Sequence, residues 1–393
     1  MFMQFADVVS RLVGQGYGGW SVHGKARTLI ANGVDVIMLT IGDPDFHTPP
    51  AVVERAVDSL RQGRTHYTPA VGELNLRQAI AEHHARQTGQ AVTYENVAVV
   101  QGAQCGLYVA AMCTLQAGDE VIMSDPVYST YPPVIGATGA TPVYVQLKPE
   151  RNFHPDLDEV AAAITPRTRA ILFNTPHNPT GAVLRHDELE SLADLALKHN
   201  LWLITDEVYS NFTFTQPHAS PAAIADLADQ CITISSLSKS HAMTGWRLGW
   251  IVGPKALIEH AGNLLAVMAY GGPPFIQDGA LTALTSEIAE VEAMRHSYRR
   301  RRDLVHTLLA DTPGVRCCNT EGGMYALLDI RSSGLSSMDF ADQACDQAQV
   351  AMLPGDAFGP SLAGYLRLSL VVPEDRLAEA CRRVQQFAVA RFG

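Results

Sequence analysis

The sequence lacks the features that define several large classes of protein. No apolar stretch reaches the length of a membrane-spanning helix, and the N-terminus lacks the charged, apolar and small-residue order of a signal peptide. The seven cysteines form no C-x-x-C pair, and an odd number without a disulfide framework is typical of reduced thiols. Positive charge is scarce: 29 Lys and Arg stand against 40 Asp and Glu, and the net charge of -11 argues against nucleic-acid binding. We therefore expect a cytoplasmic protein that binds neither membranes nor nucleic acids, and we assign no metal ligands.

Two local patterns could suggest other ligands. Arg299-Arg300-Arg301-Arg302 is the one cationic cluster, but acidic residues precede it in a helical pattern, so we expect a solvated helix face. The glycine-rich run 14–19 has the wrong spacing for a dinucleotide-binding fingerprint and no strand before it, which argues against a nicotinamide dehydrogenase. Neither pattern indicates a binding site.

Short, continuous apolar runs rich in β-branched residues recur between residues 97 and 252. Segments of helical length and periodicity, such as 187–200, lie between them. Continuous rather than alternating hydrophobicity is typical of strands covered on both faces, which indicates a mostly parallel α/β sheet. We expect six strands, at 97–100, 120–123, 170–173, 202–205, 231–234 and 249–252.

Polar motifs directly follow nearly every one of these expected strands. They are Gly102-Ala103-Gln104, Asp125-Pro126, 174–181, 206–209 and 235–239. Ligands of open α/β sheets gather at the carboxyl ends of the strands. The motifs should therefore converge on one site, which favours an enzyme.

The character of the sequence changes near residue 286. A charged helical pattern follows, and further strand-like runs come at 322–328 and 365–370. We expect a second, smaller α/β domain built from the C-terminal third and the N-terminal arm. The predicted division is a large domain of residues 46–285 and a small domain of residues 1–45 together with 286–393.

The run from Ser235 to Trp250, SSLSKSHAMTGWRLGW, carries the clearest chemistry. It places Lys239 among small hydroxyl residues, with Arg247 eight positions on and glycines on both sides of that arginine. A lysine amine can form a Schiff base with an aldehyde cofactor, while serine hydroxyls, an arginine and closely approaching backbone hold the cofactor's phosphate. The run resembles the cofactor-lysine motif of class I/II aminotransferases, the fold-type-I pyridoxal phosphate (PLP) enzymes. The resemblance implies an α/β fold with a mostly parallel seven-stranded sheet in the large domain and a smaller α/β domain.

The resemblance also assigns the contacts with the cofactor. Asp206 ends an expected buried strand, where a carboxylate is costly unless paired, and its partner would be the protonated ring nitrogen. A helix N-cap is the alternative for Asp206. Tyr209 and Asn178 would donate to the phenolic oxygen, and Tyr128 would stack on the ring, with an ordinary core tyrosine as the alternative. Lys239, Asp206 and Tyr209 are thus the expected catalytic residues. The expected phosphate contacts are Gly102, Ala103, Gln104, Ser236, Ser238 and Arg247.

The expected substrate end of the site centres on Arg367. This residue is a charge within an apolar strand, and a bidentate clamp on the substrate α-carboxylate explains its type and placement. The resemblance gives the backbone amide of Gly42 a contact with the other oxygen of the same carboxylate and also places Asn178 at the substrate. Tyr67 resembles the tyrosine that reaches the cofactor phosphate of a neighbouring subunit, which implies a homodimer with shared active sites.

The implied reaction is a ping-pong transamination that moves the α-amino group of an L-amino acid to a 2-oxo acid, with Lys239 moving the α-proton. A PLP-dependent lyase or decarboxylase on the same fold would keep the same cofactor residues and stays open. A non-catalytic regulatory domain of this type is disfavoured, because no basic helix-turn-helix precedes the motifs.

The residues of these motifs resemble those of the arginine–pyruvate transaminase branch of the family. A guanidinium side chain would favour a carboxylate or aromatic partner. Asp43, Asp45 and Asp278 are the candidates, although surface or capping roles are favoured for each.

Overall fold

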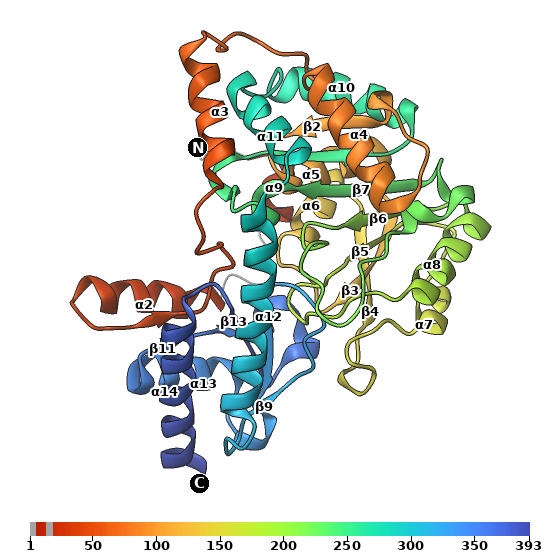
Figure 1. Cartoon of the computed structure of the whole chain (residues 1–393). Coiled ribbons are helices and arrows are strands. Elements are labelled where there is room, and N and C mark those ends of the chain that lie inside the picture. The colour runs from red at the N-terminus through yellow and green to blue at the C-terminus, as the bar shows by residue number, and fades with distance from the viewer. Residues whose placement is uncertain (1–4, 13–18) are drawn as a thin grey trace, which may run out of the picture.

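The computed structural model describes residues 5–12 and 19–393, and a seven-stranded sheet forms its largest layer (Figure 1). The strand order is β2-β8-β7-β6-β5-β3-β4. All neighbours from β7 to β4 run parallel, whereas β8 runs antiparallel to both β2 and β7. The prediction of a mostly parallel seven-stranded sheet is therefore confirmed. The strands are β2 (Val97–Val100), β3 (Glu120–Asp125), β4 (Thr141–Gln146), β5 (Thr168–Asn174), β6 (Trp202–Asp206), β7 (Cys231–Ser236) and β8 (Gly249–Val252).

The six strands expected from the sequence are all present, and the seventh, β4, was missed. β4 lies at the edge of the sheet, and only Val145 among its residues is buried. An edge strand has a neighbour on one side only, so it needs no continuous apolar run. Pro142, which lacks a backbone donor, is tolerated in such a position.

Helices cover both faces of this sheet. α5 (Ala103–Thr114), α6 (Tyr131–Thr138) and α10 (Lys255–Met268) pack on one face through a cluster that includes Val121 and Met123. α7 (Leu157–Ala162) and α8 (His186–His199) pack on the other face, which carries Ile122. α3 (Pro50–Arg61), α4 (Leu74–Thr88), α9 (Leu237–Ser240) and α11 (Pro274–Thr285) surround a further cluster beside β2 and β8. Because both faces are covered, the inner strands are mostly apolar, with polar residues toward their carboxyl ends.

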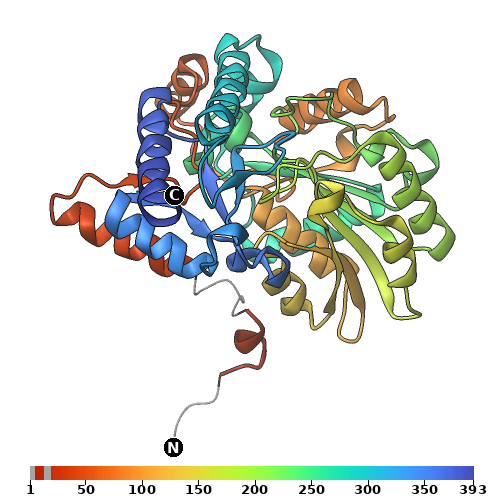
Figure 2. The same cartoon turned by 90° about the horizontal axis from the view of Figure 1, so that it is seen from below.

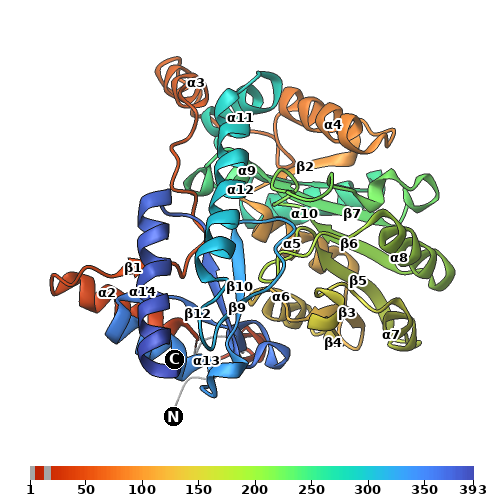
Figure 3. The same cartoon turned by 60° about the horizontal axis from the view of Figure 1, so that its bottom comes forward.

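A second, four-stranded antiparallel sheet lies beside the first (Figures 2 and 3), in the order β12-β13-β10-β9. Its strands are β9 (Arg316–Cys317), β10 (Tyr325–Asp329), β12 (Leu353–Pro354) and β13 (Tyr365–Ser369). α12 (Ala289–Leu309) and α13 (Ser337–Gln343) contact this sheet, and α14 (Glu374–Phe392) packs against α12. In Figure 1 the long α12 descends from the level of α9 to β9.

The N-terminal arm joins this second layer. It contributes α2 (Trp20–Ala31) and β1 (Ile37–Met38), and β1 pairs in parallel with β11 (Val350–Ala351). The short α1 (Val8–Arg11) instead contacts α6 beside the large sheet. One hydrophobic cluster contains Val22 and Leu39 from the arm together with Tyr298 and Leu366 from the C-terminal third. This shared cluster supports the proposed small domain of residues 1–45 with 286–393.

The expectation of a solvated arginine cluster is wrong for Arg301. Arg299 and Arg300 are exposed, but Arg301 is 4% exposed and donates to both carboxylate oxygens of Asp45, at 2.7 and 2.8 Å. Arg301 lies on the same stripe of α12 as the buried residues Met294, Tyr298 and Val305. Helical periodicity therefore turns this one arginine inward.

Over residues 5–12 and 19–393, no helix is both long and apolar enough to cross a membrane. No group of His, Cys, Asp and Glu in these ranges is arranged to hold a metal ion, and all seven cysteines are free. Residues 14–18 of the glycine-rich run lie outside the described ranges.

Candidate active site

The carboxyl ends of the central strands open into a pocket of about 280 Å³. Residues of the second sheet (Tyr325 on β10 and Arg367 on β13) and of the N-terminal arm complete its wall. Every expected site residue lines the pocket except Gly102 and Tyr67. The expected residues that do are Gly42, Ala103, Gln104, Tyr128, Asn178, Asp206, Tyr209, Ser236, Ser238, Lys239, Arg247 and Arg367.

Asp206 is a buried anion at the end of β6. Its Oδ1 accepts the backbone amide of Val208 at 3.1 Å, and its Oδ2 accepts the hydroxyl of Tyr131 at 2.6 Å. No Lys, Arg or His in the described part of the chain forms an ion pair with it, and burial raises its pKa to about 6. A turn rather than a helix follows Asp206, so the alternative of a helix N-cap is wrong. Asp206 is thus a buried carboxylate without a cationic hydrogen-bond partner among the described residues.

Lys239 lies in α9, directly after β7. Its Nζ donates to the carbonyl oxygen of Gly42 at 2.6 Å, which ties the N-terminal arm to the large sheet. A Cβ at Gly42 would overlap the hydroxyl of Tyr325, so only glycine fits this close approach. The Oγ of Ser236 accepts the amide of Ser238 at 3.3 Å and thereby caps α9.

A cradle suited to an anion lies where α5 begins. Gly102 precedes the helix with φ +85°, and a Cβ there would overlap the guanidinium of Arg247. Arg247 itself has φ +53°, which is uncommon for a residue with a side chain and often marks a functional site. Its Nη1 donates to the Thr244 carbonyl at 2.8 Å and its Nη2 to the Gln101 carbonyl at 3.3 Å. The helix N-terminus and the arginine together offer a phosphate site.

Arg367 is a buried cation on β13, with 3% of its surface exposed. Its Nη1 donates to Oδ1 of Asn178 at 2.9 Å and its Nη2 to the Thr40 carbonyl at 2.7 Å. Its guanidinium lies between the rings of Tyr325 and Phe358, 4.0 and 4.6 Å from their centroids. Its Nε is buried without a partner, and no carboxylate in residues 5–12 or 19–393 pairs with it. The arginine is therefore free to bind an anionic ligand.

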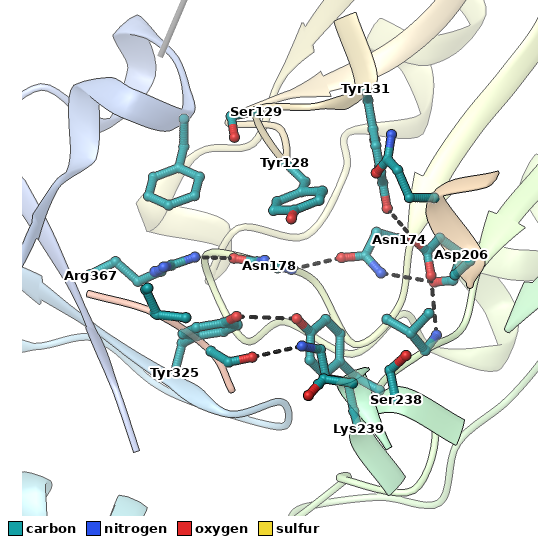
Figure 4. Close-up of a pocket in the computed structure, with 18 of the residues that line it drawn as sticks. Tyr128, Ser129, Tyr131, Asn174, Asn178, Asp206, Ser238, Lys239, Tyr325 and Arg367 are labelled. Carbon is teal, nitrogen blue, oxygen red and sulfur yellow. Dashed lines mark hydrogen bonds between the residues drawn. The ribbon is translucent and has the colours of Figure 1, made fainter. Parts of the chain in front are cut away.

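A row of hydrogen bonds joins the two charged ends of the pocket (Figure 4). Asn178 accepts from Arg367 through Oδ1, so its side-chain amide is left as a donor. The backbone amide of Asn178 donates to Oδ1 of Asn174, and Nδ2 of Asn174 donates to the backbone carbonyl of Asp206, both at 2.8 Å. This row links the guanidinium of Arg367 to the backbone of Asp206 at the end of β6.

The two expected tyrosines are held by other tyrosines. The hydroxyl of Tyr209 lies 3.2 Å from that of Tyr325, and burial raises the pKa of Tyr209, so it stays a donor. The ring of Tyr128 packs edge-on against Tyr131.

Sequence reasoning missed Tyr131, Asn174, Tyr325 and Phe358. Two had a usable signal: Tyr131 follows three residues after Tyr128, and Asn174 ends the strand beside β6. Tyr325 and Phe358 reach the pocket from the second sheet and its connections, which no local pattern reveals.

Tyr67 lies outside the pocket. Its side chain is 86% exposed, and its ring contacts that of Tyr270 at 5.1 Å between centroids.

None of the three aspartates considered for a guanidinium lines the pocket. Asp43 accepts the hydroxyl of Thr244 at 2.7 Å, and Asp45 pairs with Arg301. Asp278 is buried and accepts from Arg64 at 2.9 Å, so the favoured surface role is wrong for it.

The fold and the site together define an enzyme of the PLP-dependent type: a lysine after a parallel strand, a buried carboxylate without a cation, and a helix N-terminus with an arginine. Comparison with known proteins identifies the family. The family model for aminotransferase class I and II matches residues 34–384, so the chain belongs to the class I and II aminotransferases.

Several relatives support this assignment over nearly the whole chain. The chain is 50% identical over 391 residues to the arginine–pyruvate transaminase AruH of Pseudomonas aeruginosa, covering 100% of both chains. It is 37% identical over 354 residues to an aspartate aminotransferase of Pyrococcus horikoshii, covering 90% of each chain. The solved structure of Thermus thermophilus aspartate aminotransferase with maleate superimposes with a TM-score of 0.93 at 35% identity, covering 98% of this chain and 100% of that one. The predicted PLP fold type I and the aminotransferase class are thus confirmed.

PLP is the cofactor of this family, and the residues of the pocket fit it. The buried carboxylate of Asp206 forms no ion pair within the described residues, and the protonated ring nitrogen of PLP would supply the positive charge that balances it. The glycine cradle at the start of α5, where any Cβ would strike Arg247, matches a phosphate.

Proposed function

We propose that this aminotransferase moves the α-amino group of L-arginine, or of another guanidino amino acid, to pyruvate by a ping-pong mechanism. The observation that carries the choice of substrate is the 50% identity, over both full lengths, to a protein named arginine–pyruvate transaminase. The pocket is in keeping with it. Among the described lining residues, Arg247 and Arg367 are the arginines, and neither is placed as a second clamp for an acidic side chain.

When bound, PLP supplies an aldehyde that links to amines and a ring that withdraws electrons from the substrate α-carbon. We assign its phosphate to Gly102, Ala103, Gln104, Ser236, Ser238 and Arg247. Asp206 would hold the ring nitrogen, and Tyr128 would stack on the ring. The free amide of Asn178 and the hydroxyl of Tyr209 would donate to the phenolic oxygen.

The substrate carboxylate would bind the guanidinium of Arg367, whose Nε has no other partner. Asn178 touches the same guanidinium and would orient it. Lys239 Nζ, held at the Gly42 carbonyl, would take the α-proton and return it. The backbone amide of Gly42 would meet the other oxygen of the substrate carboxylate, since only the carbonyl oxygen of Gly42 is used by Lys239.

A transfer assay with labelled amino acid tests this function. Purified enzyme with α-¹⁵N-arginine and pyruvate should yield ¹⁵N-alanine, with aspartate and 2-oxoglutarate as comparison substrates. Release of carbon dioxide without labelled alanine would instead indicate a decarboxylase. Borohydride reduction and peptide mapping should place the cofactor on Lys239, and Lys239→Ala should abolish both readouts.

We further propose a cytoplasmic homodimer with shared active sites. The exposed ring of Tyr67 contacts the exposed ring of Tyr270, which supports a subunit contact at that surface. The seven unpaired cysteines support a reducing compartment.

Subunit mixing tests the shared site. A hybrid of Tyr67→Phe and Lys239→Ala subunits would contain one site with both groups intact. Mixing the two poorly active variants should therefore restore activity, and a mixture no more active than its parts would contradict the shared site.

A further inference from the structure

Tyr131, the first residue of α6, contacts two different parts of the site (Figure 4). Its hydroxyl donates to Oδ2 of Asp206 at 2.6 Å. Its ring packs edge-on against the ring of Tyr128, with 5.6 Å between centroids and an interplanar angle of 84°. Tyr131 is 3% and Asp206 8% exposed, so water cannot readily replace this hydrogen bond.

The position of Tyr131 is itself fixed by the phosphate end of the pocket. Thr130, which precedes α6, donates its hydroxyl to the side-chain oxygen of Gln104 in the first turn of α5, at 2.7 Å. α6 therefore begins at a set place relative to α5. The start of α6 therefore fixes the position from which the hydroxyl of Tyr131 reaches Asp206.

Asp206 keeps room for a further donor. The amide of Val208 takes one site on Oδ1 and Tyr131 one site on Oδ2. A carboxylate offers about four acceptor sites, so the two bonds set its plane without filling it.

We propose that Tyr131 is a positioning residue that keeps the Asp206 carboxylate ionised and turned toward the protonated ring nitrogen of PLP. The inference rests on the proposed role of Asp206.

The charges around Asp206 support this role. Burial raises the pKa of Asp206 to about 6, while the bonds from Tyr131 and Val208 and the charge of Lys239 lower it and Glu207 raises it. Burial and the nearby carboxylate raise the pKa of Tyr131 itself, so its hydroxyl stays a donor. Removing that donor raises the pKa of Asp206 further, and the carboxylate then takes up a proton at a higher pH.

The first test is the affinity of the apoenzyme for PLP as a function of pH. Tyr131→Phe keeps the ring and loses the hydroxyl, so we expect binding about tenfold weaker near neutral pH, with the loss of binding on acidification moved up by about one pH unit. Tyr365→Phe is the matched control, because the hydroxyl of Tyr365 is also buried but has no partner. It should bind PLP as the wild type does.

A second arm separates the hydroxyl from packing. An analogue of PLP with carbon in place of the ring nitrogen cannot donate to Asp206, so Tyr131→Phe should bind it as tightly as the wild type does. Equal losses for PLP and the analogue would mean that Tyr131 acts through Tyr128, and no loss for either would remove the role altogether; both outcomes overturn the proposal.

A double variant distinguishes loss of the hydrogen bond to Asp206 from a general folding defect of Tyr131→Phe. Asp206→Asn removes the buried charge, so adding Tyr131→Phe to it should change PLP affinity little; a further tenfold loss would contradict the coupling. If borohydride reduction of the wild-type enzyme places no cofactor on Lys239, the proposed function is overturned. If the cofactor is on Lys239 but Tyr131→Phe binds PLP as the wild type does, this inference alone is overturned.

Discussion

Two buried arginines, Arg301 and Arg367, have similar surroundings and different electrostatic states. Each lies over two aromatic rings: Arg301 over Phe46 and Tyr298, and Arg367 over Tyr325 and Phe358. Arg301 also forms two hydrogen bonds to the carboxylate of Asp45, whereas Arg367 is bound by two neutral oxygens.

The difference separates a structural charge from a binding charge. A buried ion that is fully paired inside the protein has its charge balanced in every state. A buried cation that faces a pocket and has only neutral acceptors and rings around it leaves its charge for a ligand to balance. The aromatic rings make the second arrangement tolerable without competing for the ligand.

The largest expected effect is on stability at the paired arginine. Arg301→Leu leaves the carboxylate of Asp45 unpaired, so we expect a loss of about 3–5 kcal/mol in the free energy of unfolding. Catalytic efficiency per folded molecule should be unchanged. Denaturant titration and steady-state kinetics check this, with Arg300→Leu as the control on the exposed side of α12, expected to change stability by less than about 1 kcal/mol. A kinetic defect in folded Arg301→Leu would break the comparison.

The next effect is on catalysis at the unpaired arginine. Arg367→Lys keeps the charge and loses the planar fork, so catalytic efficiency should fall by about 2 kcal/mol, or roughly 30-fold, for amino and oxo acids alike. The melting temperature should stay within a few degrees of the wild type, because no ion pair is lost. An unstable variant with normal kinetics would make Arg367 a second structural arginine.

His154, like Arg301, is a buried group paired with carboxylates inside the protein, and its contribution to stability depends on pH. Its Nδ1 contacts Glu188 at 2.9 Å and its Nε2 contacts Glu321 at 3.0 Å, and these carboxylates raise its pKa to about 9 against the opposing effect of burial. Because the pKa is raised on folding, this stability is fully present below about pH 6.5 and is lost as the pH rises through 9. The melting temperature should therefore drop by a few degrees across that window, and His154→Gln should flatten the drop. A parallel profile in the variant would assign the drop to other groups.

The smallest effect concerns the rings around Arg367. Tyr325→Leu removes one face of the aromatic pair, and we expect KM for every substrate to rise by about fivefold, equivalent to about 1 kcal/mol. Tyr325→Phe keeps the ring, so its KM should stay near the wild-type value. If both variants raise KM equally, the hydroxyl near Tyr209 matters more than the ring.

Most of the large sheet could be predicted from the sequence because its strands are buried on both faces. β4 could not, because an edge strand with one buried residue carries no such run. Asp206 and Arg367 were recognisable as candidates because each is a charge in an apolar strand, and Lys239 because its motif resembles the cofactor-lysine motif of a known family. Tyr325 and Phe358 were not, because aromatic residues in apolar segments look like core until their contact with Arg367 is seen. The prediction for Arg301 was wrong because its charged neighbours in sequence suggested a solvated helix face. Its spacing from Met294 and Tyr298 places it on the buried face of α12.

The pairing of β1 with β11 also sets an order of assembly during synthesis. All seven strands of the large sheet have been made by Val252, so the Asp206 and Lys239 end of the pocket can form while translation continues. Ile37 in β1 can pair only after Val350 has been synthesised, and Arg367 is synthesised later still. The nascent arm stays without its partner strand for most of the chain's synthesis, and the substrate end of the site is the last part to close.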